Sequence, residues 1–167
     1  MHSSIPLVTF IGKSNSGKTT LLVKLIPELK RRGYRIGSIK HTHHSVTIDQ
    51  EGKDSWRHRR AGAEMVALLS GNTLSFVRDY PDEPDVEFIR DRFMDGVDIV
   101  LAEGFKWTGI PKVWVFRSEN ADSIIRKDES LAAVVSDRDV DLGVPWFDID
   151  DVPAVADFIE KRFLKPA

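Results

Sequence analysis

Residues 10–22, FIGKSNSGKTTLL, place two glycines, a lysine and two threonines between an apolar run and a helical pattern. The stretch from Gly12 to Thr19 fits G-x-x-x-x-G-K-[ST], the pattern of a phosphate-binding loop, at every fixed position. Glycine lets the backbone curl so that consecutive N–H groups face phosphate oxygens, and a following helix offers its unsatisfied N–H groups to the same anion. The apolar residues 5–11 predict a buried strand before the loop, and residues 17–33 predict an amphipathic helix after it. The stretch therefore predicts a strand, a polyphosphate-binding loop and a helix in sequence.

Two residues of this loop are candidates for direct chemistry. The ammonium group of Lys18 is expected to reach the β and γ phosphates, and the Thr19 hydroxyl is expected to ligate Mg²⁺, which prefers oxygen ligands. The nucleotide-binding candidates are consecutive: Gly12, Lys13, Ser14, Asn15, Ser16, Gly17, Lys18, Thr19 and Thr20.

The rest of the chain alternates strand and helix patterns. Strands are predicted at residues 34–40, 97–104, 112–118 and 131–137, a β-hairpin at 64–79, and helices at 55–63, 82–95 and 151–165. An apolar stripe of Val86, Ile89, Phe93 and Met94 is expected to bury one face of the helix at 82–95. We predict an α/β fold of the P-loop NTPase kind, with a mostly parallel sheet flanked by helices, a hairpin excursion and one domain over residues 1–167.

Composition narrows the function classes. The chain has 167 residues, 41% of them hydrophobic and 30% charged, with a net charge of −2, and it has no cysteine. The charge gives no support to a nucleic-acid or membrane-surface binder, and disulfides and thiolate zinc sites are excluded. Its first residues lack the pattern of a signal peptide, and no apolar run approaches the roughly 20 residues that span a bilayer. We expect a cytoplasmic protein without nucleic-acid or membrane partners.

An acid is needed to complete the metal site of such a loop. Glu103 ends the strongest strand pattern, residues 97–104, and ligand sites lie at the carboxyl ends of parallel strands. We therefore assign Thr19 and Glu103 to the metal, and Lys18 and Glu103 to catalysis. Asp49, in the loop after the second strand, is a further candidate metal ligand. An ordinary strand-end acid and a solvated loop residue are the alternatives for Glu103 and Asp49.

No Asn-Lys-x-Asp motif for guanine is present, and the nearest substitute is Ser136-Asp137 at the end of the strand pattern 131–137. The Asp137 carboxylate would accept hydrogen bonds from guanine N1–H and N2–H₂, a pair that adenine lacks. A turn or N-cap role for Asp137 is the alternative.

Two segments carry candidate substrate or partner contacts. The stretch KHTHH at 40–44 contains His41 and His43, and a basic stretch at 52–63 contains Lys53, Arg57 and Arg60. We expect these side chains to contact an anion or substrate, because arginine suits bidentate phosphate contacts. A transition-metal site on the histidines and a solvated helix face for the arginines stay open.

Five segments in this order resemble one family: GKSNSGKTTLL, IKHTHH, GKDS with AGA beyond it, AEGFK and VVSD. The chain resembles the MobB family of molybdopterin-guanine dinucleotide biosynthesis adaptor proteins from about residue 6 to about residue 163. The resemblance implies a homodimeric GTP-binding protein that hydrolyses GTP slowly and acts with a MobA-type guanylyltransferase, which attaches GMP to molybdopterin. It also implies GTP, Mg²⁺ and bound molybdopterin as ligands, and it adds Asp54 and Lys106 to the candidate substrate or partner contacts.

The sequence is also compatible with two other functions. A small-molecule kinase would use Lys18 and Mg²⁺ in the same way but phosphorylate a pterin or nucleoside. A nucleotide-gated scaffold would present its ligand without any chemistry of its own. For the GTPase, slow intrinsic hydrolysis is expected, because the sequence offers neither a convincing water-positioning base nor an arginine finger, which is worth about 10³–10⁵ in rate.

Overall fold

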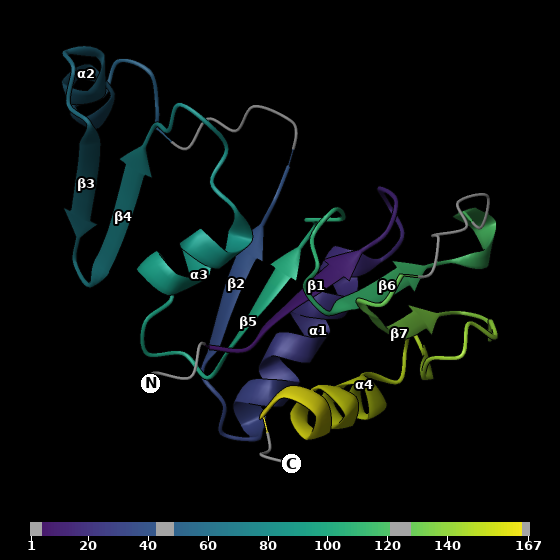
Figure 1. The fold of residues 1–167 in the computed structure, drawn as a ribbon. Helices are drawn as coiled ribbons and strands as arrows, with labels where there is room; N and C mark the ends of the chain where they lie inside the picture. The colour runs from purple at the N-terminus through teal and green to yellow at the C-terminus, as the bar shows by residue number, and fades with distance from the viewer. Residues whose placement is uncertain (1–4, 43–48, 121–127, 165–167) are drawn as a thin grey trace. The chain divides into compact units, whose positions relative to one another are not determined.

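A computed structural model describes residues 5–42, 49–120 and 128–164. The contacts divide the chain into two compact units (Figure 1). The first comprises Met1–His41 and Asp85–Ala167, and the second comprises Thr42–Pro84. The prediction of one domain over the whole chain stays a prediction.

The first unit contains a six-stranded parallel sheet (Figure 1). Its strand order is β2-β5-β1-β6-β7-β8, so β1 lies near the middle with the phosphate-binding sequence at its carboxyl end. The strands are β1 (Leu7–Ile11), β2 (Ile36–Lys40), β5 (Ile99–Glu103), β6 (Lys112–Phe116), β7 (Leu131–Ser136) and β8 (Trp146–Asp148). The predicted α/β class is confirmed, and the short edge strand β8 is an element that the sequence patterns did not indicate.

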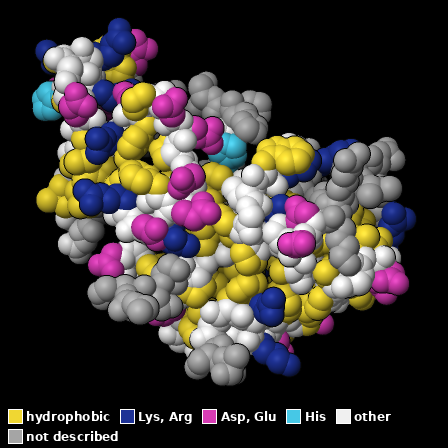
Figure 2. Space-filling model, viewed as in Figure 1, with side chains coloured by type: hydrophobic (Ala, Val, Ile, Leu, Met, Phe, Trp, Pro, Cys, Tyr) yellow, Lys and Arg dark blue, Asp and Glu magenta, His cyan; other side chains and the backbone are white. Residues whose placement is uncertain are grey.

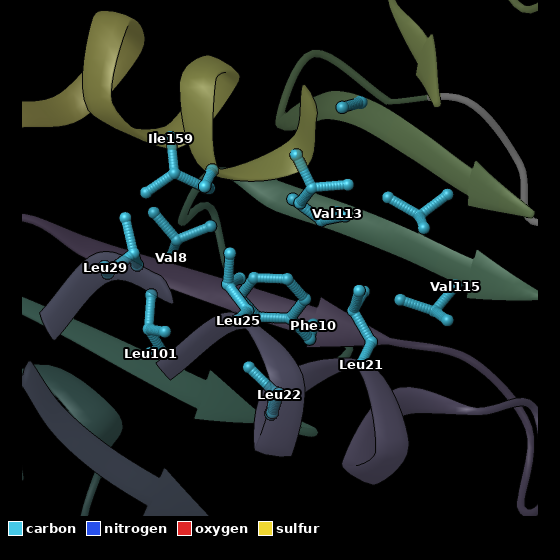
Figure 3. Close-up of a cluster of buried hydrophobic side chains, with 14 of the residues drawn as sticks. Val8, Phe10, Leu21, Leu22, Leu25, Leu29, Leu101, Val113, Val115 and Ile159 are labelled. Carbon is cyan, nitrogen blue, oxygen red and sulfur yellow. The ribbon is translucent and has the colours of Figure 1, made fainter. Parts of the chain in front are cut away.

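One face of the sheet is covered by α1 (Lys18–Arg31) and α4 (Val152–Ile159). Leu21, Leu25 and Leu29 of α1 are buried against Val8 and Phe10 of the central strand (Figure 3). These leucines follow helical spacing, so the pattern identified the buried face correctly. The side chain of Arg32 is 16% exposed and pairs with Glu28, Asp157 and Glu160, which ties the end of α1 to α4 and the π-helical turn after it, η2 (Glu160–Leu164).

The end of α1 is fixed by a glycine, as the sequence indicated. Gly33 has φ +95°, and its N–H donates to the Lys30 carbonyl at 2.9 Å. The Tyr34 N–H donates to the Leu29 carbonyl at 3.2 Å. These two bonds form a Schellman motif, which satisfies helix carbonyls and turns the chain into β2.

The opposite face of the sheet carries α3 (Val86–Phe93), whose first residue is fully buried against the sheet. Asp85 caps this helix by accepting a hydrogen bond from the Phe88 N–H at 2.6 Å. Ile89 and Met94 are partly buried, as expected, but Phe93 is 47% exposed, so its assignment to the buried stripe was wrong. The helix ends at Phe93 and is short, so the buried stripe continues through Met94 in the next segment.

The second unit contains α2 (Asp54–Arg60) and the antiparallel hairpin of β3 (Met65–Ser70) and β4 (Thr73–Arg78). The predicted short helix and hairpin are thus confirmed. The pairs Met65–Arg78, Ala67–Phe76 and Leu69–Leu74 share one face of the hairpin. Met65, Leu69, Leu74 and Phe76 on this face are between 48% and 71% exposed, and Figure 2 shows hydrophobic side chains gathered over the hairpin. Across the described residues of both units, no helix is long and apolar enough to cross a membrane.

Candidate nucleotide-binding site

The phosphate-binding sequence forms a loop between β1 and α1 whose glycines are required by contacts and backbone angles. A Cβ built on Gly12 would lie 2.1 Å from the Val115 carbonyl oxygen of β6, so the two backbones approach too closely for any side chain. Gly17 has φ +96° and directly precedes α1. Asn15 also has a positive φ, +61°, and Ser16 is fully buried. The loop is therefore a tight turn whose shape depends on contact with β6.

The Lys18 ammonium group folds back over this loop. Its Nζ donates to the carbonyl oxygens of Gly12 at 2.9 Å and Lys13 at 2.6 Å, and it lies 3.4 Å from the Ser16 hydroxyl. Burial lowers the pKa of Lys18, and the nearby Glu103 carboxylate opposes this shift. Lys18 is thus held as a partly desolvated cation at the mouth of the loop.

Thr19 and Glu103, which the sequence assigned to a metal, lie together at the carboxyl edge of the sheet. The Thr19 hydroxyl lies 2.9 Å from each oxygen of the Glu103 carboxylate. The Lys40 ammonium group, at the end of β2, lies 3.4 Å from Glu103 Oε1. These contacts arise because β5 pairs in parallel with both β1 and β2, so their ends meet. Hydroxyl and carboxylate oxygens fit Mg²⁺, which completes its octahedron with water and phosphate oxygens.

The segment after Glu103 turns sharply against β2. Gly104 and Phe105 both have positive φ, +105° and +57°. A Cβ on Gly104 would lie 3.0 Å from the Cβ of His41, and the His41 ring lies 4.8 Å from the Phe105 ring, centre to centre. The Lys106 ammonium group lies 4.8 Å from the ring centre of Trp107. His41 therefore packs against the segment that directly follows Glu103, and Lys106 is part of that segment. His43 lies outside the described residues.

Asp137, the candidate for base recognition, follows β7 and is held by the residue that begins η1 (Ser118–Asn120). Its two carboxylate oxygens accept hydrogen bonds from the Ser118 N–H at 2.7 Å and the Ser118 hydroxyl at 2.8 Å. Desolvation raises the pKa of Asp137, but the Ser118 hydrogen bonds and the Arg117 charge outweigh it, so the pKa is lower than usual. Asp137 therefore stays ionised and fixed in position, with acceptor lone pairs to spare.

Ser136 has a different environment. It is fully buried, its hydroxyl donates to the Arg138 carbonyl at 2.5 Å, and it accepts from Trp146 Nε1 at 2.8 Å. This hydroxyl joins β7 to β8. The sequence singled out Ser136 and Asp137 but missed Ser118, whose only signal was its position at the end of the strand predicted at residues 112–118.

The remaining candidate residues lie in the second unit, Thr42–Pro84. Asp49 accepts a hydrogen bond from the Ser55 hydroxyl at 2.7 Å, and its other oxygen lies 3.6 Å from Arg59 Nε. Arg60 lies over the ring of Trp56, 5.6 Å from the ring centre. Of the three further candidates, Lys53 directly precedes α2, Asp54 is its first residue, and Arg57 lies in its middle, 3.6 Å from the Asp54 carboxylate. Asp49 thus supports α2 within this unit, while the role of Asp49 as a metal ligand stays a prediction.

Groups of three or more His, Cys, Asp or Glu side chains able to hold a metal are absent among the described residues. A parallel sheet, a glycine loop between a central strand and a helix, and the Thr19–Glu103 pair beside it define the class of P-loop nucleotide-binding folds.

Comparison with known proteins identifies the family within this class. The family model for "Molybdopterin guanine dinucleotide synthesis protein B", MobB, matches residues 7–137. A molybdopterin-guanine dinucleotide biosynthesis adapter protein of Haemophilus influenzae is 40% identical over 161 residues, which cover 96% of this chain and 90% of that protein. A protein of the same description from Escherichia coli is 41% identical over 160 residues, which cover 93% of this chain and 91% of that protein.

Solved structures agree with this result. A crystal structure of molybdopterin-guanine biosynthesis protein B superposes with a TM-score of 0.75 at 31% identity, covering 95% of this chain and 99% of that one. The crystal structure of Bacillus subtilis MobB gives a TM-score of 0.76 at 27% identity, covering 97% of this chain and 99% of that one. The chain belongs to the MobB family of molybdopterin-guanine dinucleotide biosynthesis adapter proteins.

Proposed function

We propose that the chain binds GTP with Mg²⁺ at the loop between β1 and α1. The observation that carries this proposal is the Thr19 hydroxyl 2.9 Å from both Glu103 oxygens, beside a loop whose glycines and lysine fit a polyphosphate. Bound Mg²⁺ would supply positive charge that draws phosphate oxygens toward the loop, held by Thr19 and Glu103. On binding, Lys18 would exchange its loop carbonyl acceptors for phosphate oxygens, and the ion pair with Lys40 would hold the Glu103 carboxylate in place.

Guanine recognition is assigned to Asp137. Its carboxylate, fixed by Ser118, would accept N1–H and N2–H₂ of guanine through its remaining lone pairs. The buried Ser136 hydroxyl supports β8 in this arrangement, so we assign it a positioning role.

Slow hydrolysis is expected of the chain alone. Phosphoryl transfer depends on positioning and charge stabilisation, and the described residues near Thr19 and Glu103 supply Lys18 and Lys40 but no assigned arginine finger. Lys18 and Glu103 are the residues that we assign to this weak GTPase activity. Turnover at tens per second by the purified chain would contradict it.

In the cell, we propose that the chain acts in the cytoplasm as the adapter of a MobA-type guanylyltransferase that attaches GMP to molybdopterin. The names of the relatives from Haemophilus influenzae and Escherichia coli support this role. Molybdopterin or the transferase would then contact the basic and histidine segments. The proposed contact residues are His41, His43, Lys53, Asp54, Arg57, Arg60 and Lys106.

The hairpin supports the expected homodimer. A two-stranded sheet alone is marginally stable, and this one exposes Met65, Leu69, Leu74 and Phe76 on one face. A second copy offers the same face, and a self-complementary patch suits an interface with two-fold symmetry. Light scattering at several concentrations should find a dimer, and Leu69→Glu should shift it toward monomer; a wild-type chain that stays monomeric would contradict the dimer.

The functional role is tested by reconstitution with the transferase, molybdopterin and GTP. Guanine dinucleotide formation should rise when this chain is added, and Lys18→Ala should remove the rise because it deletes the loop cation. Lys30→Ala, a basic residue in the last turn of α1, is the matched control and should behave as wild type. An unchanged yield without the chain, or a phosphorylated pterin or nucleoside as product, would contradict the adapter role.

A further inference from the structure

One arginine that neither the motif nor the family resemblance singled out lies between the loop and Asp137. Arg117 directly follows β6, which pairs with β1 through Ile11–Trp114 and with β7 through Phe116–Ser136. Because the strands run parallel in the order β1-β6-β7, the residue after β6 comes at the same edge of the sheet as the loop after β1 and Asp137 after β7.

The strand alternation places the Arg117 side chain on the α1 side of the sheet. Val113 and Val115 of β6 belong to the core that includes α1, and Arg117 continues this alternation two residues further. A Cβ built on Gly17 would lie 3.6 Å from Arg117 Nε, so the guanidinium group lies beside the residue that precedes α1.

The backbone around Arg117 is fixed on both sides. Val115, two residues before Arg117, has its carbonyl oxygen in close contact with Gly12. Ser118, the residue after it, donates its N–H and hydroxyl to Asp137. Arg117 is therefore carried by a rigid support rather than by a free loop, which is the condition for placing a side chain on a ligand.

The surroundings of Arg117 favour the binding of a further anion. A cation beside a helix N-terminus opposes the helix dipole, and Lys18 adds a second positive charge there. Within residues 5–42, 49–120 and 128–164, no hydrogen bond or ion pair of the Arg117 guanidinium is found, whereas Arg32 and Arg35 pair with carboxylates. The Arg117 charge helps to lower the pKa of the Asp137 carboxyl, but Asp137 is already hydrogen-bonded to Ser118.

The strand order indicates which part of a nucleotide Arg117 would meet. Glu103 and Lys40 lie on the β5 side of the loop, where the metal and terminal phosphates are assigned. Asp137 lies on the β7 side, where the base is assigned. β6 lies between them, so its last side chain faces the portion of the nucleotide between base and terminal phosphates.

We propose that Arg117 contacts the α-phosphate of the nucleotide and so links the phosphate loop to the base-recognition side of the site. This inference rests on the proposed binding of GTP. The planar guanidinium fork suits a phosphate with two non-bridging oxygens, and its place beside Gly17 puts it at the positive helix N-terminus, which also attracts an anion.

The test is a calorimetric titration of GTP and of GDP, each with Mg²⁺, into the wild type, Arg117→Ala and Arg117→Lys. Because both nucleotides carry the α-phosphate, Arg117→Ala should weaken both by about tenfold or more, as for loss of a charge-assisted hydrogen bond. Arg117→Lys should fall in between, since it keeps the charge but not the fork. Arg92→Ala, an exposed arginine on α3, is the matched control and should leave both affinities unchanged.

The outcomes separate this inference from the proposed function. Wild type that binds neither nucleotide would refute the proposed function and the inference together. Wild type that binds GTP while Arg117→Ala binds equally well would refute the inference alone, as would a loss confined to GTP, which would place the contact on the γ-phosphate. The thermal midpoint of nucleotide-free Arg117→Ala should stay close to that of wild type, and a marked drop would instead assign Arg117 a structural role.

Discussion

Replacing Gly12 by alanine tests whether the loop is held by close contact with β6. The new methyl carbon would lie 2.1 Å from the Val115 carbonyl oxygen and 2.7 Å from the Ser16 hydroxyl oxygen. Ser16 is fully buried and Val115 is in the middle of the sheet, so the methyl can be relieved only by moving backbone. Overpacking of this kind costs about 1–3 kcal/mol, and a side chain at a φ of +152° adds strain of about 1 kcal/mol. We expect Gly12→Ala to lower the free energy of unfolding by about 3 kcal/mol.

Gly33→Ala is the matched control for backbone conformation. Gly33 also has a positive φ, but no described heavy atom lies within 4 Å of its built Cβ. Its loss should be about 1 kcal/mol, from conformational strain alone. Wild type and both variants should be unfolded with urea in the absence of nucleotide. The free energy of unfolding should depend on urea concentration with the same slope in all three. If Gly12→Ala costs no more than Gly33→Ala, the close contact between the loop and β6 is not what fixes the loop.

Three further perturbations follow from the described contacts. Arg32→Ala should lower the free energy of unfolding by about 2 kcal/mol in urea, because three carboxylates each lose one ion-pair partner at the junction of α1 and α4. Arg31→Ala, on the exposed side, should change the free energy of unfolding little. The hydrogen bond from buried Lys112 lowers the pKa of Asp128 from 3.8 to about 2. This pair therefore stabilises the fold above pH about 4, and its contribution is lost as the pH falls to about 2. When the free energy of unfolding is measured against pH, Asp128→Asn should not show this loss. Glu103→Gln should remove most of the Mg²⁺ dependence of GTP affinity in calorimetry while leaving metal-free affinity little changed, and an unaltered Mg²⁺ dependence would exclude Glu103 from the metal site.

The sequence predicted the fold well where patterns are local. The leucine spacing of α1, the glycine at its end and the apolar run of β5 each correspond to the element expected. Phe93 was assigned to the buried stripe because its spacing from Val86 is helical, but the helix ends there and the side chain turns outward. The strand β8 has only three residues, too few to show a period.

The candidate site was predictable as far as parallel strands bring their ends together. Glu103 was expected beside Thr19 for this reason, and the two side chains are in hydrogen-bond contact. The partners of these residues were not predictable, because the Ser118–Asp137 clamp and the proximity of Arg117 to Gly17 depend on which strand lies between β1 and β7. Strand order is a tertiary property that no local pattern records.

The central claim, guanine nucleotide binding at this loop, is tested most directly by calorimetric titration of the purified chain with GTP and with ATP, each with Mg²⁺. The same titration of Asp137→Ala is compared with Asp139→Ala, an exposed neighbour two residues away. The account predicts tighter binding of GTP than of ATP in wild type and in Asp139→Ala, and loss of that preference in Asp137→Ala. Equal affinities for GTP and ATP in wild type, or a GTP preference that survives in Asp137→Ala, would contradict it.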